Sequence, residues 1–110
     1  MHSVLIVEDL PEIRDWLVQV AEEAFPGVSV TRAARVNEAL ARVTERRYDL
    51  ALIDLGLPDG SGIDVVGAVR QRQPSAVPVV VTIYDDDDHL FPALQAGAFG
   101  EHQFQGADVN

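Results

Sequence analysis

The chain has 110 residues, which fits one compact domain because domains hold roughly 100–200 residues. Its composition, 47% hydrophobic and 24% charged, is that of a globular chain and excludes wholesale disorder. It contains no Cys, which excludes disulfides and thiolate metal sites, and its net charge of −10 disfavours binding to nucleic acid and to anionic membranes. No apolar run approaches the ~20 residues of a membrane span, and the N-terminus lacks a basic region followed by an apolar stretch. We therefore expect a cytoplasmic protein.

Short apolar segments alternate with segments of helical periodicity along the chain. Strands are predicted at 4–7, 28–31, 50–53 and 77–81. Apolar residues three and four positions apart predict helices at 11–24, 36–46 and 63–73, and Asp88 can cap a shorter helix at 89–96. Gly60 and Gly62 are expected to serve the geometry of a turn before the third helix. Strands that alternate with helices predict a parallel sheet with helices on both faces.

Oxygen-bearing side chains follow three of the predicted strands. Glu8 and Asp9 come directly after the first strand, Asp54 after the third and Thr82 after the fourth. In open parallel sheets ligands bind beyond the carboxyl ends of the strands, so we expect these side chains to face one crevice. Three carboxylates repel one another unless a cation compensates, and hard oxygen ligands suit Mg²⁺. A carboxylate beside that metal can act as a nucleophile towards a phosphoryl group. The alternative is that each residue only starts a loop or caps a helix.

The order of these motifs resembles the receiver domain of bacterial two-component response regulators over residues 2 to about 100. The resemblance rests on Glu8-Asp9, on Asp54 within the segment 52–62 (LIDLGLPDGSG), on Thr82 and on the segment 96–100 (AGAFG). It implies a flavodoxin-like, doubly wound α/β fold with strand order 2-1-3-4-5. It also implies that a histidine kinase passes a phosphoryl group to Asp54, which would make the chain a signalling domain and not an enzyme in its own right.

The resemblance also assigns roles to single residues. Glu8, Asp9 and Asp54 match the carboxylates that hold Mg²⁺, and the backbone carbonyl of Gly56 matches a further ligand. Thr82 matches the hydroxyl residue that turns towards the phosphoryl oxygens. The sequences of segments 55–62 and 82–89 resemble those of receivers that are joined to a helix-turn-helix DNA-binding domain. We therefore expect a separate output domain to bind nucleic acid.

The end of the chain departs from the family's pattern. Family members usually follow the segment that matches 97–100 with an aromatic residue, two apolar residues and a Lys, whereas this chain reads Glu101, His102, Gln103 and Phe104. The chain contains no Lys and no Arg beyond Arg72, so no shift of the alignment restores that charge. We therefore expect a receiver domain over 1–104 and a tail over 105–110, with a weakly predicted fifth strand and no fifth helix. A homodimer is expected to cover the face of the sheet that this helix would leave bare.

Two other classes of function compete with the phosphorylated receiver. The first is a pseudo-receiver, a protein-interaction module whose output does not depend on phosphorylation, and the departures after residue 100 favour it. The second is a Mg²⁺-dependent phosphatase or hydrolase, which would need a general acid near Asp54 and usually a cap domain. The chain is too short for such a cap.

Overall fold

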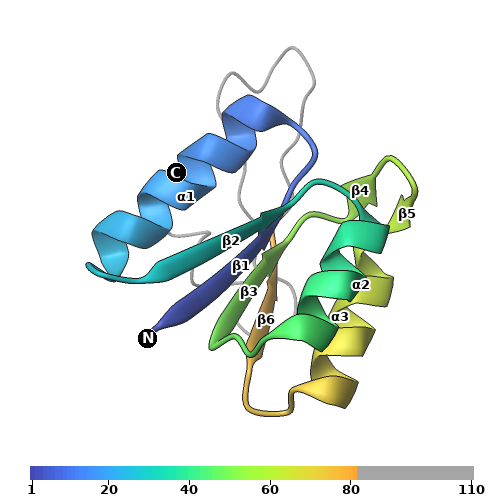
Figure 1. Cartoon of the computed structure of the whole chain (residues 1–110). Coiled ribbons are helices and arrows are strands. Elements are labelled where there is room, and N and C mark those ends of the chain that lie inside the picture. Colours follow the sequence, from blue (N-terminus) through green and yellow to red (C-terminus); the bar gives the residue numbers. More distant parts are fainter. Residues whose placement is uncertain (82–110) are drawn as a thin grey trace.

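A computed structural model of the chain describes residues 1–81 (Figure 1). Strands and helices alternate along this part of the chain, apart from one short hairpin. The elements are β1 (Ser3–Val7), α1 (Pro11–Ala24), β2 (Ser29–Ala33), α2 (Val36–Glu45), β3 (Leu50–Ile53), β4 (Gly56–Leu57), β5 (Gly60–Ser61), α3 (Gly62–Arg72) and β6 (Val77–Val80). Each strand and helix predicted within these residues is present, with ends displaced by at most a few residues.

Four strands form a parallel sheet in the order β2-β1-β3-β6. The two inner strands, β1 and β3, pair so that Val7 lies opposite Ile53, and β3 pairs with β6 so that Ile53 lies opposite Val80. Counted along the main sheet, this is the order 2-1-3-4, which agrees with the doubly wound α/β fold expected from the sequence. The predicted fifth strand, the helix at 89–96, Thr82 and the tail at 105–110 lie outside the described residues.

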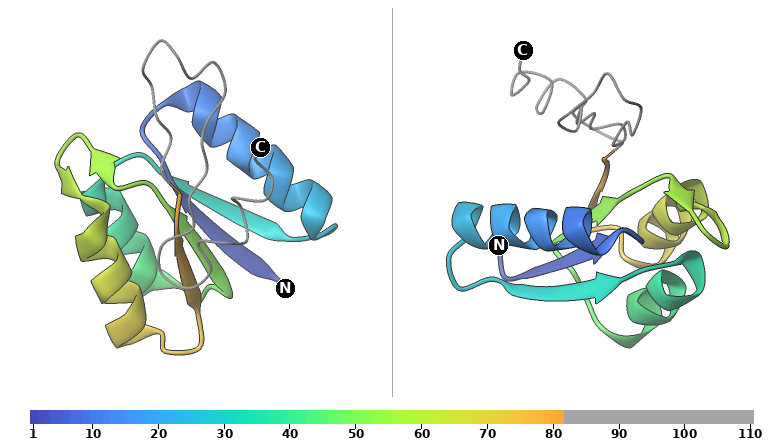
Figure 2. Two further views of the ribbon diagram at one scale, coloured as in Figure 1. Left: turned by 180° about the vertical axis from the view of Figure 1, so that it is seen from behind. Right: turned by 90° about the horizontal axis from the view of Figure 1, so that it is seen from above.

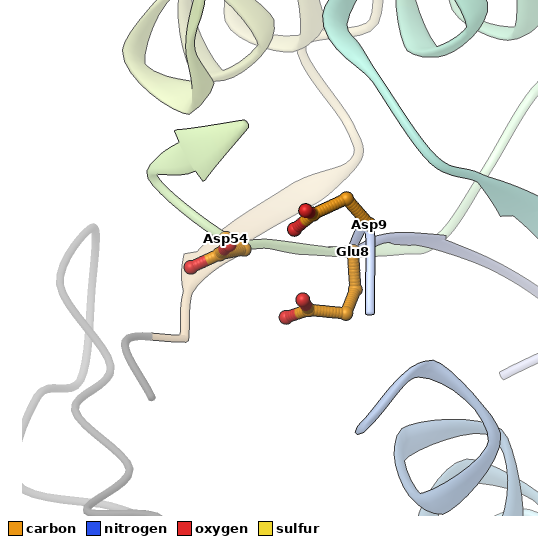
Figure 3. Close-up of side chains that lie close together, drawn as sticks. All are labelled: Glu8, Asp9 and Asp54. Atoms are coloured by element: carbon orange, nitrogen blue, oxygen red, sulfur yellow. The ribbon is translucent and has the colours of Figure 1, made fainter. Parts of the chain in front are cut away.

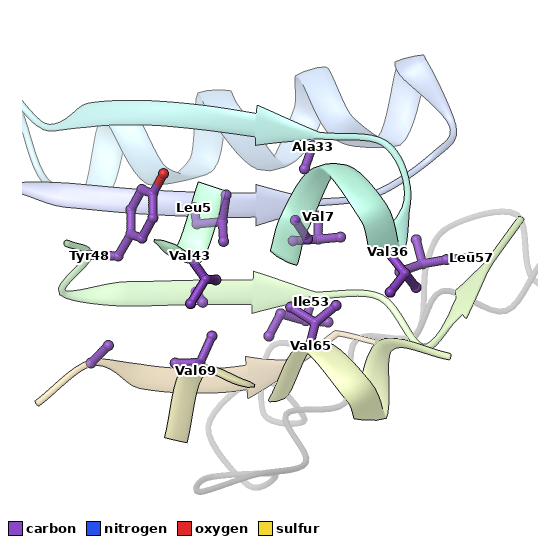
Figure 4. Packing of buried hydrophobic residues seen from close by; sticks show 13 residues of the cluster. Leu5, Val7, Ala33, Val36, Val43, Tyr48, Ile53, Leu57, Val65 and Val69 are labelled. Carbon is purple, nitrogen blue, oxygen red and sulfur yellow. The ribbon is translucent and has the colours of Figure 1, made fainter. Parts of the chain in front are cut away.

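Helices cover the two faces of the sheet separately. Helix α1 lies on one face, and α2 and α3 lie side by side on the other (Figure 2). Successive residues of β1 alternate between the faces: Val4 and Ile6 pack with α1, whereas Leu5 and Val7 belong to the cluster under α2 and α3 (Figure 4). These four side chains are fully buried. This explains why the segment reads as a continuous apolar run without polar alternation.

Local sequence sets the ends of the helices. Pro11 opens α1, where the missing N–H costs no hydrogen bond because the first turn leaves its N–H groups unpaired. Beyond the end of α1, Gly27 has φ +86°, a left-handed conformation that glycine adopts without strain. Helix α3 begins after Ser61, whose hydroxyl accepts a hydrogen bond from the N–H of Ile63 at 3.1 Å.

The segment between β3 and α3 is more ordered than the turn that the sequence predicts. Residues 56–61 form a small antiparallel hairpin, in which Gly56 pairs with Ser61 and Leu57 with Gly60 around a turn at Pro58 and Asp59. Leu57 is buried in the core cluster that also holds Val36 of α2. The hairpin is therefore anchored to the body of the protein. None of the helices in residues 1–81 has the length and apolar content needed to cross a membrane.

Candidate functional site

The carboxyl ends of β1 and β3 bring the predicted acidic residues together. Glu8 and Asp9 directly follow β1, and Asp54 directly follows β3. The ladder continues beyond both strands, because the N–H of Asp54 donates to the carbonyl of Val7 at 2.9 Å and the N–H of Glu8 donates to the carbonyl of Ala33 at 2.9 Å. Neighbouring parallel strands end at the same edge of a sheet, so the side chains that follow them share one crevice.

The three carboxylates form one cluster. One carboxylate oxygen from each of Glu8, Asp9 and Asp54 lies within 4.8 Å of the others. The side chains reach towards a common space beyond the strand ends (Figure 3). The prediction that these residues lie close together is confirmed, while Thr82 falls outside the described residues.

Glu8 is the most deeply buried member of the cluster, with only 1% of its surface exposed. Burial raises the pKa of Glu8 from the usual 4.5 to about 7, and the negative charges of Asp54 and Asp9 add to this rise. A hydrogen bond from the N–H of Leu10 to Oε2, at 3.1 Å, works in the opposite direction. Ionisation of Glu8 is therefore energetically unfavourable in the metal-free site.

Asp54 is half-buried and lies beside the hairpin. Burial raises the pKa of Asp54, and the charge of Asp9 adds to this effect. Hydrogen bonds from the backbone N–H groups of Gly56 and Leu55 lower the pKa of Asp54 by favouring its ionised form. The hairpin thus contacts the carboxylate of Asp54 through its own first residue, Gly56.

The acidic cluster has the features of a binding site for a hard divalent cation. Oε1 of Glu8 is buried and has no hydrogen-bond partner among residues 1–81. The nearby Arg14 directs its guanidinium to the main-chain carbonyls of Glu8 and Asp9, at 3.0 and 3.5 Å, so its hydrogen bonds go to carbonyl groups. An unpartnered buried oxygen among three carboxylates is expensive without a compensating charge. The residues therefore fit Mg²⁺, which takes oxygen ligands and retains part of its water shell.

Gly62 lies against the backbone of Asp54. The role in turn geometry that the sequence predicts for this glycine is wrong. A Cβ atom at Gly62 would overlap the carbonyl oxygen of Asp54 and would lie 2.9 Å from both its carbonyl carbon and Cγ2 of Ile53. The expected turn geometry does apply to Gly60, whose φ is +155°, but Gly62 has no positive φ. Close approach of two backbone segments, which no local pattern encodes, explains the glycine at 62.

We expect Gly62→Ala to lower the free energy of unfolding by about 2 kcal/mol, as overpacking of a tight contact does. Because the clash falls on the backbone of Asp54, the variant should also bind Mg²⁺ more weakly than the unchanged chain. Chemical denaturation and metal titration measure the two effects. Gly67→Ala is the matched control, because no atom of residues 1–81 beyond its chain neighbours and its own helix backbone lies within 4 Å of its added Cβ. That change is expected to raise stability by roughly 0.5–1 kcal/mol, since Ala favours a helix interior. Equal stabilities for both variants would contradict the close-approach argument.

Comparison with known proteins identifies the family of this chain. The family model for the response regulator receiver domain matches residues 4–101. Response regulator protein PilR of Pseudomonas aeruginosa is 41% identical over 100 residues, covering 89% of this chain and 22% of its own length. The DNA-binding transcriptional activator DevR/DosR of Mycobacterium tuberculosis is 37% identical over 101 residues, covering 91% of this chain and 46% of its own. The chain thus spans less than half the length of these relatives.

Solved structures show the same fold. Response regulator protein TrrA of Thermotoga maritima, solved in complex with Mg²⁺ and BeF, has a TM-score of 0.68 and 32% identity, covering 77% of this chain and 72% of that one. TrrA solved in complex with histidine kinase ThkA has a TM-score of 0.66 and 31% identity, covering 79% and 73%. The family match spans most of the chain and includes the acidic cluster. The chain therefore belongs to the family of response regulator receiver domains.

Proposed function

We propose that this receiver domain accepts a phosphoryl group on Asp54 in a reaction that requires Mg²⁺. Glu8, Asp9 and Asp54 would hold the ion together with the backbone carbonyl of Gly56. The observation that carries the proposal is the convergence of three carboxylates at one edge of the sheet, with one buried oxygen of Glu8 left without a partner among the described residues. When bound, Mg²⁺ would offset the negative charge that accumulates between the carboxylates and the incoming phosphoryl group.

Asp54 is the carboxylate best placed to act as the nucleophile. It follows the inner strand β3 and accepts hydrogen bonds from the N–H groups of Gly56 and Leu55. A carboxylate oxygen of Asp54 would attack the phosphorus of a phosphohistidine, forming a new O–P bond while the P–N bond breaks and its electron pair returns to the imidazole. Glu8 and Asp9 would keep their negative charge and serve only as ligands. Thr82 is proposed to supply the hydroxyl that turns towards the phosphoryl oxygens.

The proposed donor is a histidine kinase, and the proposed output is transcriptional. The complex of TrrA with ThkA supports a kinase as the partner, because TrrA shares the fold of this chain. A separate DNA-binding domain is proposed because the name of DevR/DosR describes a DNA-binding activator of which this chain matches 46%. The receiver unit itself, proposed to span 1–104, would then pass the signal on without contacting DNA.

A homodimer is proposed for the face that carries α1. In residues 1–81, α1 is the one helix on that face, and it carries the exposed apolar side chain of Trp16. A second copy packed over α1 would bury this side chain. Sedimentation equilibrium at micromolar concentration tests this, and a monomer that does not bind a hydrophobic dye would count against it.

Intact-mass spectrometry after incubation with a small acyl phosphate and Mg²⁺ tests the proposed function. We expect the mass of one phosphoryl group to be added to the unchanged chain and to Asp64→Ala, a control that removes an exposed acid from the first turn of α3. Asp54→Ala should lose phosphorylation entirely and should no longer bind Mg²⁺ in a calorimetric titration. A chain that binds neither phosphoryl group nor Mg²⁺ would instead be a pseudo-receiver.

A further inference from the structure

The turn of the β4–β5 hairpin reaches across to the beginning of α2. The carboxylate of Asp59 accepts hydrogen bonds from two successive backbone N–H groups: Oδ1 from Val36 at 2.7 Å and Oδ2 from Asn37 at 3.0 Å. These are the first residues of α2, whose N–H groups have no partner within the helix. The residue that precedes the helix, Arg35, makes no side-chain capping hydrogen bond in the described part of the chain. Asp59 therefore caps α2 from a distant segment of the sequence.

Apolar contacts hold the same two elements together. Leu57 of β4 and Val36 of α2 are both buried in one core cluster. The backbone at Gly60 lies beside Val36, where an added Cβ would be 3.4 Å from Cγ2, an ordinary van der Waals distance. The N–H groups of Asn37 and Val36 also lower the pKa of Asp59, so its carboxylate is ionised at neutral pH and matches the positive end of the helix dipole.

The other end of the hairpin lies at the acidic site. Gly56 is the first residue of β4, and its N–H donates to the carboxylate of Asp54. Because Gly56 pairs with Ser61 and Leu57 with Gly60, a shift at the turn moves both strands of the hairpin. A hairpin of two-residue strands has little stability of its own. Its position must therefore come from contacts with the rest of the protein, which include the burial of Leu57 and the hydrogen bonds of Asp59 to α2.

We propose that Asp59 is a positioning residue of the acidic site, which holds the β4–β5 hairpin on α2 and thereby fixes the backbone of Gly56 beside Asp54. The inference rests on the proposed Mg²⁺ function of this site. Asp59 itself would not contact the ion. Its hydrogen bonds join the hairpin that follows Asp54 to the N-terminus of α2, and this bridge would preorganise the site.

A matched pair of variants separates positioning from helix capping. Asp59→Ala removes the bridge, whereas Glu38→Ala removes another carboxylate from the same helix N-terminus, where its Oε1 accepts a hydrogen bond from the N–H of Ala34 at 2.8 Å. Both changes remove one negative charge and one capping group, but only Asp59 joins α2 to the hairpin. We expect Asp59→Ala to bind Mg²⁺ about tenfold more weakly, at the lower end of the range for losing an outer partner of a metal ligand. Glu38→Ala should bind Mg²⁺ as the unchanged chain does.

Hydrogen exchange supplies a readout that needs no metal. In the metal-free protein, the amide of Gly56 should exchange faster in Asp59→Ala than in the unchanged chain, and Glu38→Ala should leave its rate unaltered. Asp59→Asn keeps one acceptor oxygen and should restore part of the Mg²⁺ affinity and part of the protection. This variant also carries the test if Asp59→Ala does not fold.

The outcomes separate this inference from the proposed function. If the unchanged chain binds Mg²⁺ and both Asp59 variants match it in affinity and in exchange at Gly56, the positioning role is wrong and the proposed function stands. If the unchanged chain does not bind Mg²⁺, the proposed function fails, and exchange at Gly56 alone decides whether Asp59 holds the hairpin. Equal loss of affinity in Asp59→Ala and Glu38→Ala would show that helix capping, and not the bridge, is responsible.

Discussion

The metal-free protein should become less stable as the pH rises from 5 to 8, and Mg²⁺ should reverse this loss. Glu8 is the cause, because its pKa is raised from 4.5 to about 7 in the folded protein. A carboxyl group whose pKa is raised by folding binds more protons in the folded than in the unfolded state. Its contribution to stability is thus fully present below pH 4.5 and is lost as the pH rises through about 7.

The size of the effect follows from the shift in pKa. Each unit corresponds to about 1.4 kcal/mol, so ionisation of Glu8 should cost roughly 2 to 3 kcal/mol between pH 5 and pH 8. The opposite shifts of Asp49 and Asp59, whose pKa values are lowered below the usual 3.8 by backbone N–H donors, act only in more acidic solution. The pKa of Asp54 is also raised by burial, so Asp54 acts in the same direction as Glu8. In the proposed site Mg²⁺ would bind the ionised carboxylates, so its stabilising effect should be larger at pH 8 than at pH 5.

Urea denaturation at pH 5 and pH 8, with and without Mg²⁺, measures these effects. Glu8→Gln is the control, because the amide keeps the shape of the side chain but does not ionise. Subtracting its pH dependence from that of the unchanged chain removes the contributions of all other ionisable groups. A metal-free protein whose stability is the same at both pH values, or Glu8→Gln with an undiminished pH dependence, would show that Glu8 does not carry the cost.

The second large effect should come from Gln73→Leu, which we expect to lower the free energy of unfolding by about 3 kcal/mol. Gln73 follows the last turn of α3 and is 6% exposed. Its Oε1 accepts from the N–H of Tyr48 at 2.8 Å, and its Nε2 donates to the carbonyls of Val43 and Arg46, each at 2.8 Å. One side chain thus joins the end of α2, the segment before β3 and the end of α3. A Leu would leave these backbone groups without that partner, and each unsatisfied buried group costs about 1–3 kcal/mol.

Gln71→Leu provides the matched control, since Gln71 lies two residues earlier in α3 and is exposed. That change should alter stability by less than about 0.5 kcal/mol. Gln73 lies before β6, at the opposite end of the sheet from the acidic cluster. Mg²⁺ affinity measured well below the unfolding transition should therefore be the same in both variants. A loss of affinity in Gln73→Leu would contradict this separation of the two ends of the sheet.

The sequence by itself determined the elements and the main residues of the site within 1–81. Periodicity is a local property, so the continuous apolar runs at 4–7 and 50–53 predicted the inner strands, and helical spacing predicted α1, α2 and α3. Parallel strands bring their carboxyl ends to one edge, which was enough to predict that Glu8, Asp9 and Asp54 meet.

Only the tertiary structure decided how unequal these carboxylates are and what surrounds them. Glu8 is 1% exposed whereas its neighbour Asp9 is half-buried, because successive residues at the end of a strand point in different directions. The need for glycine at 62 comes from the backbone of Asp54, which lies eight residues earlier in the sequence. The partners of Gln73 and Asp59 are more than 20 residues away. Such contacts depend on how elements pack against one another, and neither periodicity nor residue type encodes that packing.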